Sequence, residues 1–207
     1  MPRMAADCVR NVVFDFGGVL VRWQPREIID AFYRDPLLRE RLRREVFQHP
    51  DWLDMDRGTL AEEAALERFA ERLDRPREEL VRLLHHVRES LAPIPDSIAL
   101  LRALEARGVP LYGLSNISVE NFAHLRERDA HWGVFRGIVI SAEVKMVKPE
   151  ARIFEHLCQA HRLVPGQTVF IDDLAANIEA AARLGFRTVL FRDAAQCAIE
   201  LERLLAR

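Results

Sequence analysis

Lysine is almost absent from this chain of 207 residues. Of its 30 basic residues only Lys145 and Lys148 are lysines, and the other 28 are arginines. Lysine carries a compact charge on a flexible stem, whereas arginine carries a planar fork that does not fit the same space. In a chain that uses arginine everywhere else, two lysines within four positions indicate that this stretch needs an ammonium group.

Cysteine is also scarce. The three cysteines, Cys8, Cys158 and Cys197, have neither CxxC nor metal-ligand spacing. An odd and scattered set does not make a disulfide framework and fits a reducing compartment. The seven histidines are scattered too, and His85–His86 has no partner at ligand spacing. We therefore expect no zinc site and interpret the His85–His86 pair as a partly exposed helix face.

Long apolar runs are missing as well. None approaches the roughly 20 residues that a membrane-spanning helix needs, and Met1–Asp7 is not typical of a secretory signal. The net charge of −2 gives no basic footprint for nucleic acid or an anionic membrane. We expect a cytoplasmic monomer or homodimer that binds a small molecule and contacts neither nucleic acid nor membrane.

Short apolar strands alternate with amphipathic helices over most of the chain. The pattern predicts strands at residues 12–14, 110–115, 137–141, 168–171 and 187–191. Such alternation is typical of an α/β fold with a doubly wound, Rossmann-like parallel sheet. The length suits one such domain with an insertion, or two small domains. We expect a Rossmann-like core formed by residues 1–21 and 93–207, and an α-helical cap at residues 22–92.

The expected cap is rich in Leu, Glu, Arg and Ala at helical spacing. Four helices are predicted, at residues 25–33, 37–47, 60–73 and 76–91. Thr59–Glu62 has the pattern of a capping box at the start of the third helix. Pro50–Trp52 is predicted to be a turn between the two helix pairs.

Polar side chains follow the predicted strands where each strand ends. Asp15 follows the first strand and precedes Gly17 and Gly18. The other polar positions are Ser115–Asn116, Ser141, Lys148 and Asp172–Asp173. In a doubly wound sheet, ligands bind beyond the carboxyl ends of the strands. The sequence therefore predicts that these residues converge on Asp15.

Three carboxylates would meet in this crevice, from Asp15, Asp172 and Asp173. Like charges at such short range cannot all ionise without a cation, and an oxygen-only ligand set suits Mg²⁺. The Lys148 ammonium, the Ser115 hydroxyl and free backbone N–H groups of the glycine turn can hold anionic oxygens. An Asp carboxylate that faces a clamped phosphoryl group is a covalent nucleophile. We therefore expect Asp15 to form an aspartyl-phosphate that water hydrolyses.

Each feature also has a structural explanation when it is taken alone. Asp172–Asp173 before a helix is more often an N-cap, and Ser115–Asn116 can equally cap the helix that follows it. A lone Asp in a glycine turn is most often an Asx-turn. The occurrence of the whole set in this order, each member at a strand end, favours a functional site.

The motif set resembles that of the haloacid dehalogenase-like (HAD) hydrolase superfamily, over nearly the whole chain. The four similar stretches are Asp15–Leu20, Leu114–Asn116, Lys148–Pro149, and Phe170–Asp173 with Asn177 and Glu179–Ala181. The helical insertion is placed like the small α-helical cap that follows the first motif in one subfamily. Within the superfamily, DFGGVL followed by Trp23 is similar to bacterial glucose-1-phosphate and other sugar-phosphate phosphatases. The phosphatase domain of soluble epoxide hydrolase is similar too.

The resemblance implies roles for the matching residues. The catalytic residues would be the nucleophile Asp15 together with Ser115 and Lys148, which hold the phosphate. Substrate contacts would come from Gly17, Gly18, Ser115, Asn116, Lys148 and Trp23. Mg²⁺ would be held by Asp15, the Gly17 carbonyl and Asp173, with Asp172 beside it. The implied activity is Mg²⁺-dependent hydrolysis of a small phosphorylated metabolite, in particular a sugar phosphate.

Gly17 departs from the family pattern. Most phosphatases of the family carry a second Asp there, which protonates the leaving group. Loss of such a general acid typically removes about 10²–10⁴-fold of the rate. Three explanations are open. The substrate has a leaving group that needs little protonation, a residue of the cap replaces the acid, or turnover is weak and the protein mainly binds its ligand.

Two alternative functions stay open at this point. One is a metal-independent L-2-haloacid dehalogenase. Those enzymes resemble the chain in cap class but carry Tyr at the position of Gly17, and have small hydroxyl residues at the positions of Asp172 and Asp173. The other is a non-catalytic binding or regulatory protein of the same fold, which the missing acid allows.

The predicted cap is expected to choose the substrate. Five of its residues lie near predicted turns and are candidates to face the crevice: Trp23, His49, Trp52, Asp54 and Arg57. For the two tryptophans, packing between helices is the more frequent role.

Overall fold

The structure is a computed structural model that describes residues 8–205. The expectation about a secretory signal concerns residues 1–7 and lies outside this range. Within the described range, no helix is both long enough and apolar enough to cross a membrane.

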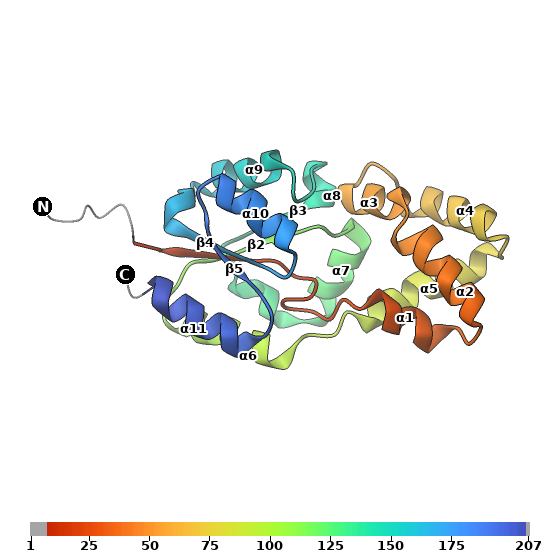
Figure 1. Cartoon of the computed structure of the whole chain (residues 1–207), viewed down its shortest axis with the longest axis horizontal. Helices are drawn as coiled ribbons and strands as arrows, with labels where there is room; N and C mark the ends of the chain where they lie inside the picture. Colours follow the sequence, from red (N-terminus) through yellow and green to blue (C-terminus); the bar gives the residue numbers. More distant parts are fainter. Residues whose placement is uncertain (1–7, 206–207) are drawn as a thin grey trace, which may run out of the picture.

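A five-stranded parallel sheet forms the centre of the larger part of the molecule (Figure 1). Its strands are β1 (Asn11–Phe14), β2 (Leu111–Ser115), β3 (Gly137–Ile140), β4 (Thr168–Asp172) and β5 (Arg187–Leu190). Their order is β3-β2-β1-β4-β5. The chain runs from β1 to β2 and β3 on one side of β1, and then crosses to β4 and β5 on the other side. A ligand crevice forms at this kind of switch point, beyond the carboxyl end of the strands. The predicted Rossmann-like α/β fold is confirmed.

Helices cover both faces of the sheet, as the continuous apolar strands require. The side chains of Val12 and Phe14 pack on one face and that of Val13 on the other, because side chains alternate along a strand. The first face is covered by α6 (Pro95–Ala106), α7 (Val119–Arg128) and α11 (Ala194–Leu205). The second is covered by α9 (Ala151–His161) and α10 (Ala175–Arg183). Short helices lie at η2 (Ala130–Val134), α8 (Ser141–Val144) and η3 (Pro165–Gln167).

The insertion after β1 is entirely helical among its regular elements and lies at one end of the molecule (Figure 1). It contains α1 (Pro25–Phe32), α2 (Pro36–Leu42), the π-helical η1 (Arg43–Phe47), α3 (Pro50–Arg57), α4 (Glu62–Leu73) and α5 (Arg77–Ser90). These helices bury a hydrophobic cluster of their own, which includes Ile29, Phe69 and Leu83. Burial of this shared core holds short amphipathic helices together. The boundaries of the cap at residues 22 and 92 remain our proposal.

Two local expectations in the insertion are wrong. The segment at Pro50 is helix α3, with Pro50 in its first turn and Gly58 as a left-handed residue after its end. Thr59 does not begin a capping box, because α4 starts only at Glu62 and no side chain caps it. The Thr59 hydroxyl instead donates to the Asp54 carbonyl oxygen at 3.2 Å, at the end of α3.

The two chain connections to the helical insertion run side by side. The Arg22 N–H donates to the Ala92 carbonyl oxygen, and the Ile94 N–H donates to the Leu20 carbonyl oxygen, each at 2.8 Å. Entry and exit are therefore fixed to each other directly after the Asp15 loop.

The end of α3 makes a third attachment to the sheet half. The Ser141 hydroxyl donates to the Asp56 carbonyl oxygen, and the Lys145 ammonium donates to the Gly58 carbonyl oxygen. Gly58 has φ of +73°, and a Cβ atom there would overlap the Ala142 carbonyl oxygen. One of the two lysines of the chain thus ties the cap helix α3 to α8.

Gly58→Ala is expected to destabilise the protein more than Gly108→Ala. Gly108 has φ of +75° but no described atom within 4 Å of the added Cβ, so its variant carries only the backbone cost of about 1 kcal/mol. At Gly58 the overlap with α8 adds roughly 1–3 kcal/mol. Urea unfolding of both variants measures the difference, and equal losses would show that α3 does not press on α8.

Candidate active site

Four segments bring polar side chains together at the carboxyl end of the sheet. Asp15 directly follows β1, Ser115 and Asp172 end β2 and β4, and Lys148 lies in the loop before α9. A cavity of about 290 Å³ lies here. The predicted residues that line it include Asp15, Ser115, Asn116, Lys148, Asp173 and Asn177. The expected convergence on Asp15 therefore occurs, although Ser141 contacts α3 instead of the cavity.

Lys148 is buried between two carboxylates. Its ammonium lies 2.8 Å from the Asp15 Oδ1 atom and 2.7 Å from the Asp172 Oδ2 atom, and its side chain is 1% exposed. Asn116 fixes its backbone from both sides: the Lys148 N–H donates to the Asn116 side-chain oxygen at 2.8 Å, and the Asn116 amide donates to the Lys148 carbonyl oxygen at 2.9 Å. The ammonium is thereby held at the carboxyl end of β1, within contact of Asp15.

Asp172 is completely buried and surrounded by donors. Its Oδ1 atom accepts hydrogen bonds from the Leu174 N–H and the Asn177 amide, each at 2.9 Å. Its Oδ2 atom accepts from the Asn177 amide at 3.0 Å and from Lys148 at 2.7 Å. The N-cap interpretation of Asp172–Asp173 is wrong, because the residue before α10 is Leu174 and no side chain caps the helix. Asp172 instead belongs to the cluster around Lys148.

Asp15, Asp172 and Asp173 form a cluster in which one carboxylate oxygen from each residue lies within 4.8 Å of the others. Three carboxylates against one ammonium leave a net negative charge when all are ionised, which a divalent cation would neutralise. Gly18, with φ of +74°, lies directly under Asp173, because a Cβ atom at Gly18 would overlap the Asp173 carboxylate. The donor set and this close approach fit a magnesium site.

Burial shifts the titration of these groups. It raises the pKa of Asp15 to about 7, with the Lys148 ammonium opposing the shift and the Asp172 carboxylate adding to it. Burial and Asp172 also raise the pKa of Asp173. Burial alone would lower the pKa of Lys148, but the two adjacent carboxylates hold it above its ordinary value. Lys148 therefore keeps its positive charge at neutral pH, whereas Asp15 holds a proton below about pH 7 that a bound metal ion would displace.

An aromatic anchor seats the Asp15 loop on the sheet. The Phe16 ring is fully buried, edge-on to Trp132 at 4.7 Å between ring centroids. It lies over Gly113 of β2, where a Cβ atom would come within 2.6 Å of the ring. The Phe16 N–H donates to the Asp15 Oδ1 atom at 2.6 Å. Packing beneath the loop thus fixes the direction of the Asp15 carboxylate.

The cap contributes an aromatic wall to the same cavity. Trp23, Phe47 and Trp52 line it, and the Trp23 and Trp52 rings stack at 5.7 Å between centroids. A Cβ atom at Gly17 would make an ordinary contact with Trp23 at 3.5 Å. Trp23 therefore fills space next to the position where the family pattern has an acid. Both tryptophans pack between helices and also face the cavity.

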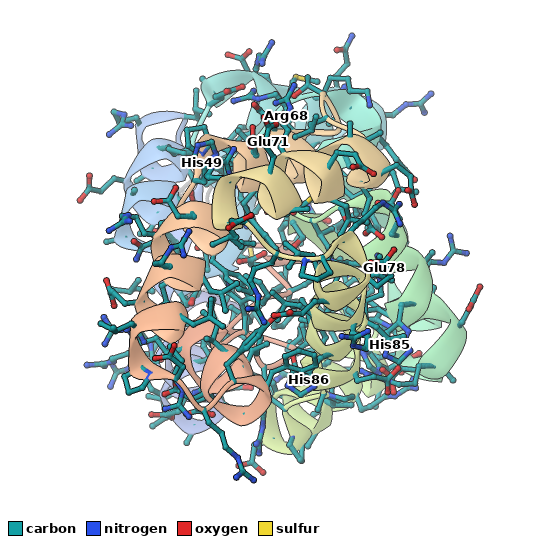
Figure 2. All side chains as sticks on the ribbon, turned by 90° about the vertical axis from the view of Figure 1, so that its right-hand side faces the viewer. His49, Arg68, Glu71, Glu78, His85 and His86 are labelled. Atoms are coloured by element: carbon teal, nitrogen blue, oxygen red, sulfur yellow. The ribbon has the colours of Figure 1, made fainter. Side chains whose placement is uncertain are left out.

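Three other cap candidates lie elsewhere. His49 and Arg68 lie close together on the outer end of the insertion (Figure 2), and both contact the Asp51 carboxylate, at 3.2 and 2.9 Å. Arg57 pairs with Glu150 at 2.6 Å. Asp54 lies near the end of α3, where its carbonyl oxygen accepts a hydrogen bond from the Thr59 hydroxyl. These residues serve the packing of α3 and its attachment to the core.

Figure 2 also shows His85 and His86 on α5, on the same end of the molecule. His85 is exposed, and the His86 ring packs against Phe32 at 5.3 Å between centroids. The interpretation of this pair as a partly exposed helix face is confirmed.

Sequence reasoning missed Asp56, which lines the cavity from the end of α3. A usable signal existed. Had Pro50 been interpreted as a first-turn residue, Trp52 and Asp56 would have fallen four positions apart on one helix face. Asn121, in the first part of α7, also lines the cavity and was missed.

Comparison with known proteins gives a matching family and several relatives. The model of a family described as haloacid dehalogenase-like hydrolase matches residues 9–185. A sesquiterpene phosphatase, astK of Aspergillus oryzae, is 28% identical over 196 residues, which are 95% of this chain and 96% of that protein. Drimenol cyclase drtB of Aspergillus calidoustus is 31% identical over 88% of this chain, but the match spans only 34% of that protein.

A solved structure has the same fold. It is the HAD family enzyme bt-2542 of Bacteroides thetaiotaomicron, in complex with magnesium and inorganic phosphate. Its TM-score is 0.75 at 21% identity, and the similarity covers 89% of this chain and 94% of that one.

Mg²⁺ is expected to raise the melting temperature more at pH 8 than at pH 6. The pKa of Asp15 in the folded chain, about 7, exceeds its ordinary value of 3.8. The folded, metal-free chain therefore keeps a proton that the unfolded chain has lost, and its stability falls as pH rises between about 4 and 7. Bound Mg²⁺ opposes this loss of stability. At a Mg²⁺ concentration of a hundred times the Kd, binding adds about 2.7 kcal/mol to the free energy of unfolding.

Differential scanning fluorimetry with and without Mg²⁺ measures the effect. Asp173→Asn is expected to abolish the Mg²⁺-dependent shift in melting temperature, whereas Asp96→Asn, which changes an exposed carboxylate on α6, should retain it. A Mg²⁺ shift that survives in Asp173→Asn, or that is larger at pH 6, would contradict the assignment.

Proposed function

This chain belongs to the haloacid dehalogenase-like hydrolase family, and we propose that it is a Mg²⁺-dependent phosphatase that hydrolyses a small phosphomonoester through an aspartyl-phosphate on Asp15. The observation that carries the proposal is the carboxylate cluster of Asp15, Asp172 and Asp173 with the Lys148 ammonium bound to two of its members. The phosphatase name of astK and the magnesium and phosphate in the bt-2542 crystals support the reaction class.

Asp15 is the proposed nucleophile because its carboxylate faces the cavity from a loop that packing holds in place. Its oxygen attacks phosphorus, the bond to the leaving group breaks, and water later cleaves the acyl phosphate. Lys148 and the Ser115 hydroxyl hold the phosphate oxygens, and Asn116 keeps Lys148 in position. The Gly17 N–H can add to this cradle. The expectation of a free N–H at Gly18 is wrong, because that group donates to the Val21 carbonyl oxygen at 2.8 Å.

Magnesium, when bound, neutralises charge on the phosphoryl oxygens. Asp15, Asp173 and the Gly17 carbonyl are the proposed ligands. Asp172 already accepts hydrogen bonds from Leu174, Asn177 and Lys148. We therefore propose that Asp172 stands beside the metal chiefly to position Lys148.

The dehalogenase alternative has less support. A dehalogenase needs no metal, and three clustered carboxylates are costly without a cation. Release of chloride from 2-chloropropionate in the presence of EDTA would favour it. A non-catalytic binding protein predicts ligand binding without turnover on any phosphate ester. A cytoplasmic location and a monomeric or homodimeric state remain predictions from the sequence.

The cavity walls bear on the substrate class. The sequence resemblance predicts a sugar phosphate, whose hydroxyl groups need polar partners once water is displaced. The cap side of this cavity offers Trp23, Phe47, Trp52 and Leu91. We therefore propose a phosphate ester with an apolar leaving group, aromatic or prenyl, ahead of a sugar phosphate. The sesquiterpene named in astK supports this class.

Asp15→Asn is expected to abolish Mg²⁺-dependent phosphate release from an aryl phosphate, a loss of at least about 10³-fold. The amide keeps the shape of the side chain but is no longer an anionic nucleophile. Phosphate release is measured colorimetrically, with Asp96→Asn as the matched control. Substantial activity in Asp15→Asn would show that another residue is the nucleophile.

Apolar phosphates are expected to have a higher kcat/KM than sugar phosphates, by about tenfold or more, because burial of the leaving group against the aromatic wall is favourable. The panel is farnesyl monophosphate and 1-naphthyl phosphate against glucose-1-phosphate and glucose-6-phosphate. Trp23→Ala should narrow the difference, whereas Ile199→Ala, an exposed apolar residue on α11, should not. A preference for glucose-1-phosphate would favour the sugar-phosphate prediction instead.

A further inference from the structure

The cavity contains one carboxylic acid that the proposed mechanism does not use. Asp15 and Asp173 belong to the nucleophile and metal cluster, and Asp56 is the third carboxylic acid in the lining. Among the described residues that line the cavity there is no His, Tyr, Cys or Glu. Since position 17 is a glycine, Asp56 is the remaining side chain with the chemistry of a proton donor for a leaving group.

Contacts from the sheet half hold Asp56 over the site. Its carbonyl oxygen accepts a hydrogen bond from the Ser141 hydroxyl, which also accepts from the Ile117 N–H at 2.9 Å. Two residues on, the Gly58 carbonyl oxygen accepts from Lys145. The end of α3 is therefore fixed to the strand ends β2 and β3, and the Asp56 side chain reaches the cavity from a rigid helix.

The surroundings of Asp56 favour its protonated form. No ion pair involves it anywhere in residues 8–205, although its neighbour Arg57 pairs with Glu150. Burial raises the pKa of Asp56 to about 8, opposed only by a hydrogen bond at the Ser118 backbone. A carboxyl group in this state carries a proton near neutral pH, which is the condition for a general acid.

We propose that Asp56 is the general acid and base of this enzyme, acting from the cap in place of the acid missing at Gly17; the inference rests on the phosphatase function proposed above. As an Asp15 oxygen bonds to phosphorus, the bond between phosphorus and the ester oxygen breaks, and that oxygen takes its electron pair and the Asp56 proton. The product leaves as a neutral alcohol. The Asp56 carboxylate then takes a proton from the water whose oxygen attacks phosphorus. Phosphate departs, Asp15 regains its carboxylate, and Asp56 is protonated again.

The alternative role for Asp56 is structural, as an acceptor at the start of α7 near Ser118. A structural residue would change the reaction of every substrate by a similar factor. A general acid would matter most where the leaving oxygen is most basic, because a good leaving group departs without protonation. Dependence on the leaving group therefore separates the two roles.

The test compares kcat/KM of wild type and Asp56→Asn with Mg²⁺ over 2,4-dinitrophenyl phosphate, phenyl phosphate and an alkyl phosphate. This parameter reports steps up to departure of the leaving group. The loss in Asp56→Asn is expected to be about 10²–10⁴-fold for the alkyl ester and below about tenfold for the dinitrophenyl ester. Asp54→Asn, on the same helix, is the matched control and should keep the wild-type ratio of the two substrates.

A second variant covers the case in which Asp56→Asn does not fold. Asp56→Glu retains a carboxylic acid and should keep the alkyl to dinitrophenyl ratio nearer to that of wild type than Asp56→Ala does. Uniform losses across the series in the Asp56 variants would overturn this inference while leaving the phosphatase proposal intact. Absence of Mg²⁺-dependent turnover in the wild type, even on the dinitrophenyl ester, would instead contradict the phosphatase proposal and this inference with it.

Discussion

The candidate active site of this protein depends on one buried ammonium group, that of Lys148. Burial of a lysine is costly unless carboxylates and hydrogen bonds surround it, and here Asp15 and Asp172 do so at 2.8 and 2.7 Å. The other contacts follow from this pairing. Asn116 holds the lysine backbone, Asn177 holds Asp172, and the excess of negative charge that remains suits a divalent cation.

The cap completes a site that the sheet leaves unfinished. The sheet half supplies the proposed nucleophile Asp15, the Lys148 ammonium and the proposed phosphate-binding groups, all at the carboxyl ends of the strands. The aromatic surface of Trp23 and Trp52 and the carboxyl group of Asp56 come from the insertion, which Ser141 and Lys145 tie to the core. Residues that fix the cap on the core therefore also fix a proposed proton donor over the reacting phosphate.

Much of this arrangement is predictable from sequence, and the limits have physical causes. Asp15, Ser115, Lys148 and Asp173 were placed together because the ends of parallel strands must meet at one edge. Helical packing has no comparable rule. Interpreting Pro50 as a turn removed α3 from the prediction and hid Asp56. His49 and Arg57 were expected at the crevice, but His49 accepts from the Asp51 N–H at the start of α3 and Arg57 pairs with Glu150. The direction of a side chain on a cap helix depends on tertiary packing.

The central claim is that Asp15 becomes phosphorylated during turnover. Quenching the wild-type enzyme during reaction with Mg²⁺ and an aryl phosphate, followed by borohydride reduction and peptide mass spectrometry, tests it most directly. Reduction of an aspartyl-phosphate converts the residue to homoserine. Homoserine is expected at position 15, and only when substrate and Mg²⁺ are both present. Continued turnover with unmodified Asp15, or modification at another residue instead, would contradict it.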